Sequence, residues 1–188
     1  MNIVLIGYRC SGKSLVGKTL ADDLGLELMD TDQVLEERVG SPIPHYVAEN
    51  GWEVFRMLEK MIIRSIANHD QRVIATGGGV VLDWENVRNL RQTGWVVWLR
   101  TGIKSIRERM GQDERSGKVR PGLIGENPLE EIEEILSQRT ALYERASDYI
   151  VNTDRQSPET VAREIIQSMP AQDQGQPQGI VRNAVLNP

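Results

Sequence analysis

The stretch from Gly7 to Ser14, which reads GYRCSGKS, has the residue types and spacing of a loop that binds phosphate. It follows the apolar run Ile3–Ile6, which predicts a buried strand, and it precedes leucine and valine residues at helical spacing. In such a unit, backbone N–H groups surround the phosphate oxygens and the helix N-terminus adds partial positive charge. We expect Lys13 to contact the β and γ phosphates of a nucleotide and Ser14 to ligate magnesium. The alternative, a glycine turn with a surface lysine, leaves the flanking strand and helix unexplained.

Two further polar stretches follow predicted strands. Asp30-Thr31-Asp32 comes at the end of a short strand over residues 27–30, and Gly77-Gly78-Gly79 follows a strand over residues 73–75. Open parallel sheets bind ligands at the carboxyl ends of their strands, so we expect both stretches near the phosphate loop. Consecutive glycines leave backbone N–H groups open to close approach by a ligand. The alternative for the glycines is a plain turn.

Charged residues in two other regions can be interpreted either as part of a binding site or as solvated surface. Arg56 and Glu59 lie three residues apart on a predicted helix over residues 52–68, so they can pair, although most such pairs are solvated surface pairs. Residues 111–126 are rich in Gly, Asp, Glu, Arg and Lys, which predicts a mobile loop. Its cations suit a lid over phosphate, but a charge run is more often only a solvated loop.

Predicted strands and helices alternate along the chain. The strands cover residues 3–6, 27–30, 73–75, 95–99 and 149–151, and the helices cover 14–24, 33–39, 52–68, 84–92, 101–110, 127–146 and 157–169. Thr101 is the expected cap of the helix that ends at Met110, and Asn127-Pro128 the expected start of the next. This alternation predicts a three-layer α/β fold, with a five-stranded parallel sheet, helices on both faces and right-handed crossovers.

Length and composition predict one domain. The chain has 188 residues, of which we assign 1–170 to that domain and 171–188, rich in Gln, Gly and Pro, to a flexible tail. A formal net charge of -5 leaves no basic surplus for binding nucleic acid. The single cysteine, Cys10, excludes an intrachain disulfide, and the first apolar run is too short for a signal peptide or membrane span. We therefore expect a cytoplasmic protein without a membrane partner.

Six ordered motifs resemble those of the shikimate kinase family, within the nucleoside monophosphate kinase group of phosphate-loop folds. They are GYRCSGKS at 7–14, DTD at 30–32, FRxLE at 55–59, GGG at 77–79, RP at 120–121 and RxxLY at 139–143. The resemblance covers about residues 2–169. It implies transfer of the γ-phosphoryl group of ATP to the 3-hydroxyl of shikimate, which gives shikimate 3-phosphate and ADP in the chorismate and aromatic amino acid pathway.

The resemblance also implies the roles of individual residues. Its catalytic residues are Lys13, Asp32 and Arg120, where Asp32 binds ring hydroxyls and accepts a proton and Arg120 is the lid arginine. Its ATP-binding set is Gly7, Cys10, Ser11, Gly12, Lys13, Ser14, Leu15, Arg109, Arg120 and Gln156, the last within an adenine loop at 154–158. Its substrate-binding set is Asp32, Arg56, Gly77, Gly78, Gly79 and Arg139, with Glu59 orienting Arg56. Mg²⁺ is held by Ser14 and, through water, by Asp30.

Elementary chemistry agrees with these implied roles, because phosphoryl transfer mostly needs charge held in place. Guanidinium groups bind carboxylate through two hydrogen bonds, which accounts for two arginines facing an acidic substrate. We expect ATP and shikimate as the ligands of a monomer. The alternatives are another small-metabolite kinase of this fold, such as a gluconate kinase, and a nucleotide-binding module without catalysis. A GTP-dependent switch is disfavoured because the chain has no Asn-Lys-x-Asp motif.

Overall fold

The computed structural model describes residues 1–115 and 129–171, with the side chains of 114 and 115 left out. Within these residues the chain forms five strands, seven α-helices and one short 3-10 helix, η1. In chain order they are β1 (Asn2–Ile6), α1 (Lys13–Leu24), β2 (Glu27–Asp30), α2 (Thr31–Val39), α3 (Ile43–Ala67), β3 (Arg72–Ala75), η1 (Val80–Leu82), α4 (Trp84–Thr93), β4 (Gly94–Arg100), α5 (Ile103–Arg115), α6 (Ile132–Ala146), β5 (Tyr149–Asn152) and α7 (Pro158–Gln167).

The five strands form one parallel sheet in the order β2-β3-β1-β4-β5. β1 lies at the centre and is buried along its whole length, because both of its edges are paired and both of its faces are covered. Strands buried on both faces are continuous apolar runs, as β1 and β4 are. The predicted parallel sheet is confirmed.

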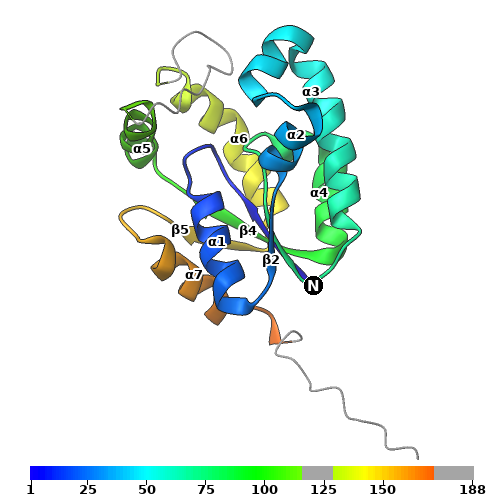
Figure 1. Ribbon diagram of the computed structural model, residues 1–188. Helices are drawn as coiled ribbons and strands as arrows, with labels where there is room; N and C mark the ends of the chain where they lie inside the picture. The colour runs from blue at the N-terminus through cyan, green and yellow to red at the C-terminus, as the bar shows by residue number, and fades with distance from the viewer. Residues whose placement is uncertain (116–128, 172–188) are drawn as a thin grey trace, which may run out of the picture.

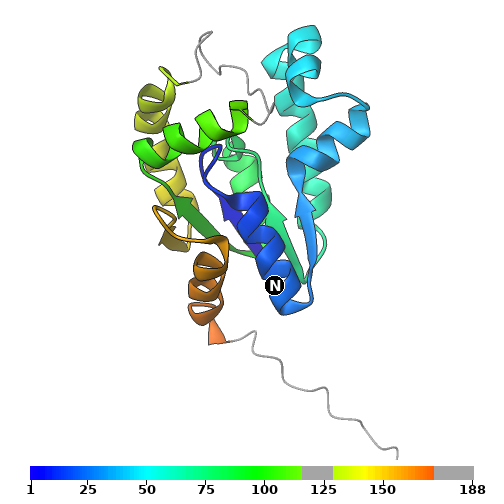
Figure 2. The same cartoon turned by 60° about the vertical axis from the view of Figure 1, so that its left-hand side comes forward.

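Helices cover both faces of this sheet, which gives three layers (Figures 1 and 2). Alternate side chains of β1 divide between two core clusters: Val4 and Ile6 pack with α3, α4 and α6, while Ile3 and Leu5 pack with α1 and α7. All five strands run in one direction, so the loops that leave their carboxyl ends gather at one edge of the sheet. The three-layer α/β architecture expected from the sequence is confirmed.

The predicted helix that begins at residue 52 belongs to a longer element. α3 starts at Ile43, and Gly51 interrupts it with φ 82° and ψ 163°, a backbone conformation outside the helical region. Glycine adopts this left-handed φ without a Cβ clash, which allows the chain to turn between two helical segments. The second segment buries Phe55, Glu59 and Ile62.

Three sequence predictions about helix ends were wrong. α5 continues to Arg115, so residues 111–115 of the predicted loop are helical; residues 116–126, which include Lys118 and Arg120, lie outside the described part of the chain. Thr101 does not cap α5, since its hydroxyl lies 2.7 Å from the Thr153 hydroxyl and the helix begins two residues later. α6 begins at Ile132, after a turn at residues 129–130.

The remaining predictions about terminal and membrane-spanning segments are tested only in part. Apart from Ala171, the expected tail lies outside the described residues. Among the residues that the structure describes, no helix is both long enough and apolar enough to span a membrane.

Candidate functional site

The loop between β1 and α1 has the backbone shape of an anion cradle. Cys10 and Gly12 have φ of 60° and 96°, and α1 begins at Lys13 with no side-chain cap on its first N–H groups. Gly7 is required by space, because a Cβ there would lie 2.7 Å from the Leu99 carbonyl oxygen. Backbone N–H groups at a helix N-terminus and in such a loop favour a bound phosphate.

The Lys13 side chain folds back across this loop. Its Nζ donates to the carbonyl oxygens of Gly7 at 2.9 Å and Tyr8 at 2.8 Å, and lies 3.3 Å from the Ser11 hydroxyl. Lys13 is 8% exposed and Ser11 is fully buried. The positive charge of the Lys13 ammonium is therefore held inside the cradle, where we expect the β and γ phosphates of a nucleotide to bind.

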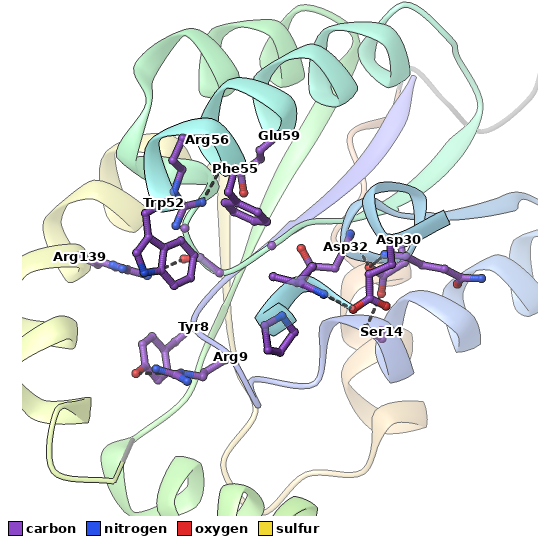
Figure 3. Close-up of a pocket in the computed structure, with 17 residues that line it drawn as sticks. Tyr8, Arg9, Ser14, Asp30, Asp32, Trp52, Phe55, Arg56, Glu59 and Arg139 are labelled. Carbon is purple, nitrogen blue, oxygen red and sulfur yellow. Dashed lines mark hydrogen bonds and ion pairs between the residues drawn. The ribbon is translucent and has the colours of Figure 1, made fainter. Parts of the chain in front are cut away.

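Ser14 and Asp30, the two predicted magnesium residues, are brought into contact. The Ser14 hydroxyl donates to Asp30 Oδ2 at 2.6 Å, while Asp30 Oδ1 accepts from the backbone N–H of Asp32 at 3.0 Å (Figure 3). Asp30 thus caps α2 with one oxygen and faces the phosphate loop with the other. Hydroxyl and carboxylate oxygens are hard ligands of the kind that Mg²⁺ prefers.

A cavity of about 600 Å³ lies at the carboxyl ends of the strands, beside the phosphate loop (Figure 3). Its polar lining includes residues that the sequence predicted from five separate motifs: Ser14, Asp30, Asp32, Arg56, Gly77, Gly78, Gly79 and Arg139. The fold therefore brings together side chains separated by more than a hundred positions in the chain. One side of the cavity presents the Asp30 and Asp32 carboxylates, and the other presents the Arg56 and Arg139 guanidinium groups.

Arg56 and Glu59 form the pair that the sequence left open as a surface contact. Arg56 Nη1 lies 2.6 Å from Glu59 Oε2, and Glu59 is only 3% exposed. Burial raises the pKa of the Glu59 carboxyl above its ordinary value of 4.5, and the nearby Arg56 and Arg139 guanidinium groups offset this only in part. The alternative of a solvated surface pair is wrong for this site.

The triple glycine makes room for the protein's own side chains. A Cβ on Gly77 would lie 2.6 Å from Asp32 Oδ1, and a Cβ on Gly79 would lie 2.2 Å from Arg56 Nη2. None of the three glycines has the positive φ that would itself require glycine. The Gly77 N–H already donates to the Thr31 hydroxyl at 3.0 Å, which leaves Gly78 and Gly79 as the better backbone donors for a ligand.

Arg139 is held at the cavity by a contact with the glycine turn. Its Nη1 donates to the Gly78 carbonyl oxygen at 3.3 Å, and Arg139 is 8% exposed. Tyr143, one turn further along α6, donates to the same carbonyl oxygen at 2.5 Å. The RxxLY motif pointed to Tyr143 by its spacing, but nothing in the sequence identified its partner.

The residues predicted to bind adenine lie on the other side of the phosphate loop. Arg109 joins two loops there, because its Nη1 donates to the Cys10 carbonyl oxygen at 3.1 Å and its Nη2 to that of Thr153 at 2.6 Å. Gln156 donates its side-chain amide to the Asn152 carbonyl oxygen at 2.7 Å, within its own turn. Leu15, at 63% exposed, lies on the open side of α1, and Arg120 lies outside the described residues.

Sequence reasoning gave no site role to several cavity residues, among them Arg9, Trp52 and Phe55. Arg9 forms an ion pair with the buried Glu131, which ties the phosphate loop to the start of α6. Trp52 and Phe55 lie against the Arg56 guanidinium, whose carbon is 5.5 Å and 5.0 Å from the two ring centroids. Aromatic residues on the cavity side of α3 could have indicated a cation partner, because rings attract cations to their faces.

Comparison with known proteins relates most of the chain to one family. The family model described as "Shikimate kinase" matches residues 9–170. A shikimate kinase of Moorella thermoacetica is 43% identical over 90% of this chain and 95% of its own length. The structure of a shikimate kinase from Acinetobacter baumannii in complex with shikimate has a TM-score of 0.81 and 32% identity, over 88% of this chain and 90% of that one.

A gluconokinase from Sinorhizobium meliloti is a more distant structural neighbour. Its TM-score is 0.52 at 16% identity, over 88% of this chain and 89% of that chain, so it shares the fold alone. The family model, by contrast, runs from the phosphate loop through the last helix of the domain. With its described motifs gathered around one cavity and its sequence matched over that length, the chain belongs to the shikimate kinase family.

Proposed function

We propose that this protein is an ATP-dependent kinase that phosphorylates the 3-hydroxyl of shikimate. The observation that carries the proposal is the division of the cavity, with Ser14 of the phosphate loop and two carboxylates on one side and Arg56 and Arg139 on the other. A substrate with a hydroxyl near the loop and a carboxylate at its far end matches this division. The product, shikimate 3-phosphate, would serve the chorismate and aromatic amino acid pathway.

The donor side binds ATP through its phosphates. The N–H groups of the loop and the first turn of α1 would surround them, and the Lys13 ammonium, already held between loop carbonyl oxygens, would exchange these contacts for phosphate oxygens. Arg109 lies where it can border the adenine. Charge fixed in place before substrate binds is what phosphoryl transfer requires most.

Ser14 and Asp30 fit a magnesium site. Among the described residues there is no cluster of three or more His, Cys, Asp or Glu side chains that could hold a metal by themselves. Mg²⁺ usually takes one or two protein oxygens and completes its shell with phosphate oxygens and water. Bound Mg²⁺ would neutralise charge that develops on the phosphate oxygens. Ser14 would be a direct ligand, and Asp30 would orient water.

The acceptor side orients shikimate and removes a proton. Arg56 and Arg139 would bind the substrate carboxylate, each through its planar guanidinium. Asp32 would bind ring hydroxyls and accept the 3-hydroxyl proton as that oxygen forms a bond to the γ-phosphorus. The bond from the γ-phosphorus to the bridging oxygen breaks, and ADP leaves with the electron pair.

Other parts of the proposal come from the family resemblance. Residues 1–170 would be one kinase domain of a cytoplasmic monomer, and Arg120, outside the described residues, would contact the transferring phosphoryl group. The lid expected at residues 111–126 would include the last residues of α5 and continue into residues outside the described part of the chain.

A coupled ADP-release assay tests the proposal. The purified protein is mixed with ATP, Mg²⁺ and either shikimate, gluconate or quinate, and the Lys13→Ala variant serves as the inactive control. We expect saturable ADP release with shikimate only. Release with gluconate alone would identify the other small-metabolite kinase, and nucleotide binding without release from any acceptor would identify the non-catalytic module.

A further inference from the structure

Arg139 and Tyr143 share one acceptor. They lie four residues apart on α6 and therefore on one face of that helix, and both donate to the Gly78 carbonyl oxygen, at 3.3 Å and 2.5 Å. A carbonyl oxygen has two lone pairs and can accept both bonds. The glycine turn and the carboxylate-binding arginine are thus joined at a single atom.

The environment of Tyr143 suits a fixed donor rather than a ligand contact. Tyr143 is fully buried, and its ring stacks on Trp98 with centroids 5.7 Å apart and an interplanar angle of 19°. Burial raises the pKa of its phenol to about 12. The hydroxyl therefore keeps its proton throughout the working pH range and donates at all times.

The Gly78 carbonyl sets the direction of the neighbouring N–H. The carbonyl of Gly78 and the N–H of Gly79 belong to one planar trans peptide unit, in which they point in opposite directions. Among the described residues, no hydrogen bond occupies the Gly79 N–H. Gly79 lines the cavity beside the Arg56 guanidinium. Neither glycine has a side chain to restrict this peptide, so the contacts of the Gly78 carbonyl help to fix its orientation, together with the turn that the Val80 N–H closes on the Gly77 carbonyl oxygen at 3.2 Å.

We infer that Tyr143 is a positioning residue for the substrate carboxylate. By donating to the Gly78 carbonyl oxygen, Tyr143 directs the Gly79 N–H toward the carboxylate that Arg56 and Arg139 bind. It also fixes the position of the carbonyl oxygen to which Arg139 donates. This inference rests on the proposed function, because it assigns the anion at this end of the cavity to shikimate.

Tyr143→Phe tests the inference with little change of shape, since the ring can still stack on Trp98. Tyr149→Phe is the matched control: its hydroxyl also bonds to side chains, Glu164 at 3.2 Å and Ser168 at 2.9 Å, but it belongs to the α7 side of the sheet. We expect Tyr143→Phe to raise the KM for shikimate roughly three- to tenfold, with the KM for ATP unchanged, as loss of one hydrogen bond predicts. Tyr149→Phe changes neither.

The double variant Tyr143→Phe with Arg139→Lys gives a second readout. Because both side chains act through one carbonyl, we expect their effects on the KM for shikimate to be non-additive. Equal effects of Tyr143→Phe on both KM values, equality with Tyr149→Phe, or strict additivity would overturn the inference. If the wild-type protein does not phosphorylate shikimate at all, the proposed function fails first and the inference with it.

A measurement on the wild type avoids dependence on how the variants fold. In ¹⁵N-labelled protein, shikimate should shift the Gly79 amide resonance and slow its hydrogen exchange, whereas ATP alone should do neither. An unchanged Gly79 amide at saturating shikimate would contradict the inference even if the enzyme is fully active.

Discussion

Arg56 and Glu59 lie one turn apart on α3, with Nη1 2.6 Å from Oε2, and Glu59 is buried while Arg56 reaches into the cavity. The Glu59 carboxylate restricts the rotamers of the Arg56 side chain. Removing this carboxylate from water costs free energy. That cost is visible in the raised pKa of Glu59, where burial outweighs the neighbouring positive charges. The pair therefore links a titration to the orientation of a substrate-binding side chain.

The first prediction concerns pH. Above its raised pKa, Glu59 is ionised and orients Arg56; as the pH falls through that pKa, protonation weakens the pair. We expect the KM for shikimate to rise on acidification, starting at a higher pH than the ordinary value of 4.5 implies. Glu59→Gln should raise this KM at neutral pH and flatten its acid dependence. The exposed Glu37→Gln is the control, and an identical pH profile for both variants would contradict the role of Glu59.

Titration of Glu59 affects stability in the opposite direction from substrate binding: acidification weakens the binding of shikimate but raises the free energy of unfolding. A carboxyl whose pKa is raised by folding binds protons more readily when folded, so ionised Glu59 lowers the free energy of unfolding as the pH increases through that pKa. Glu59→Gln should remove this contribution. Denaturant titrations of both proteins across the acid range measure it, and a wild-type carboxyl contribution that grows with pH would show that the pKa is lowered instead.

The second prediction concerns Arg139. Lysine at this position keeps the charge but loses the planar, two-point contact with a carboxylate. We expect Arg139→Lys to raise the KM for shikimate by about tenfold or more, as loss of a charge-assisted hydrogen bond implies, with little change in the KM for ATP. Arg163→Lys on the exposed side of α7 is the control. Equal increases in both KM values would remove Arg139 from the substrate site.

The third prediction concerns Asp32 as the proton acceptor. Asparagine retains the size and hydrogen-bonding capacity of the side chain but cannot take the proton. We expect Asp32→Asn to lower kcat by roughly 10² to 10⁴, the range for loss of a general base, while ATP affinity stays near wild type. The exposed Asp22→Asn on α1 controls for charge. Retained turnover in Asp32→Asn would exclude the residue as the base.

The fourth prediction separates two functions of Asp30, which caps α2 and contacts Ser14. Asparagine is as good a cap as aspartate, whereas alanine costs about 1 kcal/mol of stability at such a position. We therefore expect Asp30→Asn to keep its melting temperature but to need more Mg²⁺ for half-maximal activity. Asp30→Ala should lose both. An unchanged Mg²⁺ requirement in both variants would exclude Asp30 from the metal site.

Much of the fold could be predicted because its determinants are local. Apolar runs such as 3–6 and 95–99 identify buried strands, and their alternation with amphipathic helices implies a parallel sheet. The direction of the strands then brings motifs far apart in sequence to one edge. The strand order β2-β3-β1-β4-β5 was not predicted, since it depends on which helices pack on which face.

The errors arose where tertiary contacts decide the local structure. Asn127-Pro128 has the pattern of a helix start, yet α6 begins only at Ile132, after Glu131 has paired with Arg9 from the phosphate loop. Arg9 and Glu131 are 122 positions apart, so their pairing could not be predicted from the spacing of residues in the sequence. The sequence also did not predict that Arg139 and Tyr143 share the Gly78 carbonyl oxygen as acceptor. Every residue has a backbone carbonyl, so the residue types do not show which one is used.

The most direct test of the proposed kinase activity is to identify its product. The protein is incubated with ATP, Mg²⁺ and shikimate, and the mixture is followed by ³¹P NMR with proton correlation to locate the new phosphate ester. We expect one molecule of shikimate 3-phosphate for each ADP formed. ADP accompanied only by inorganic phosphate, or an ester on a different hydroxyl, would contradict it.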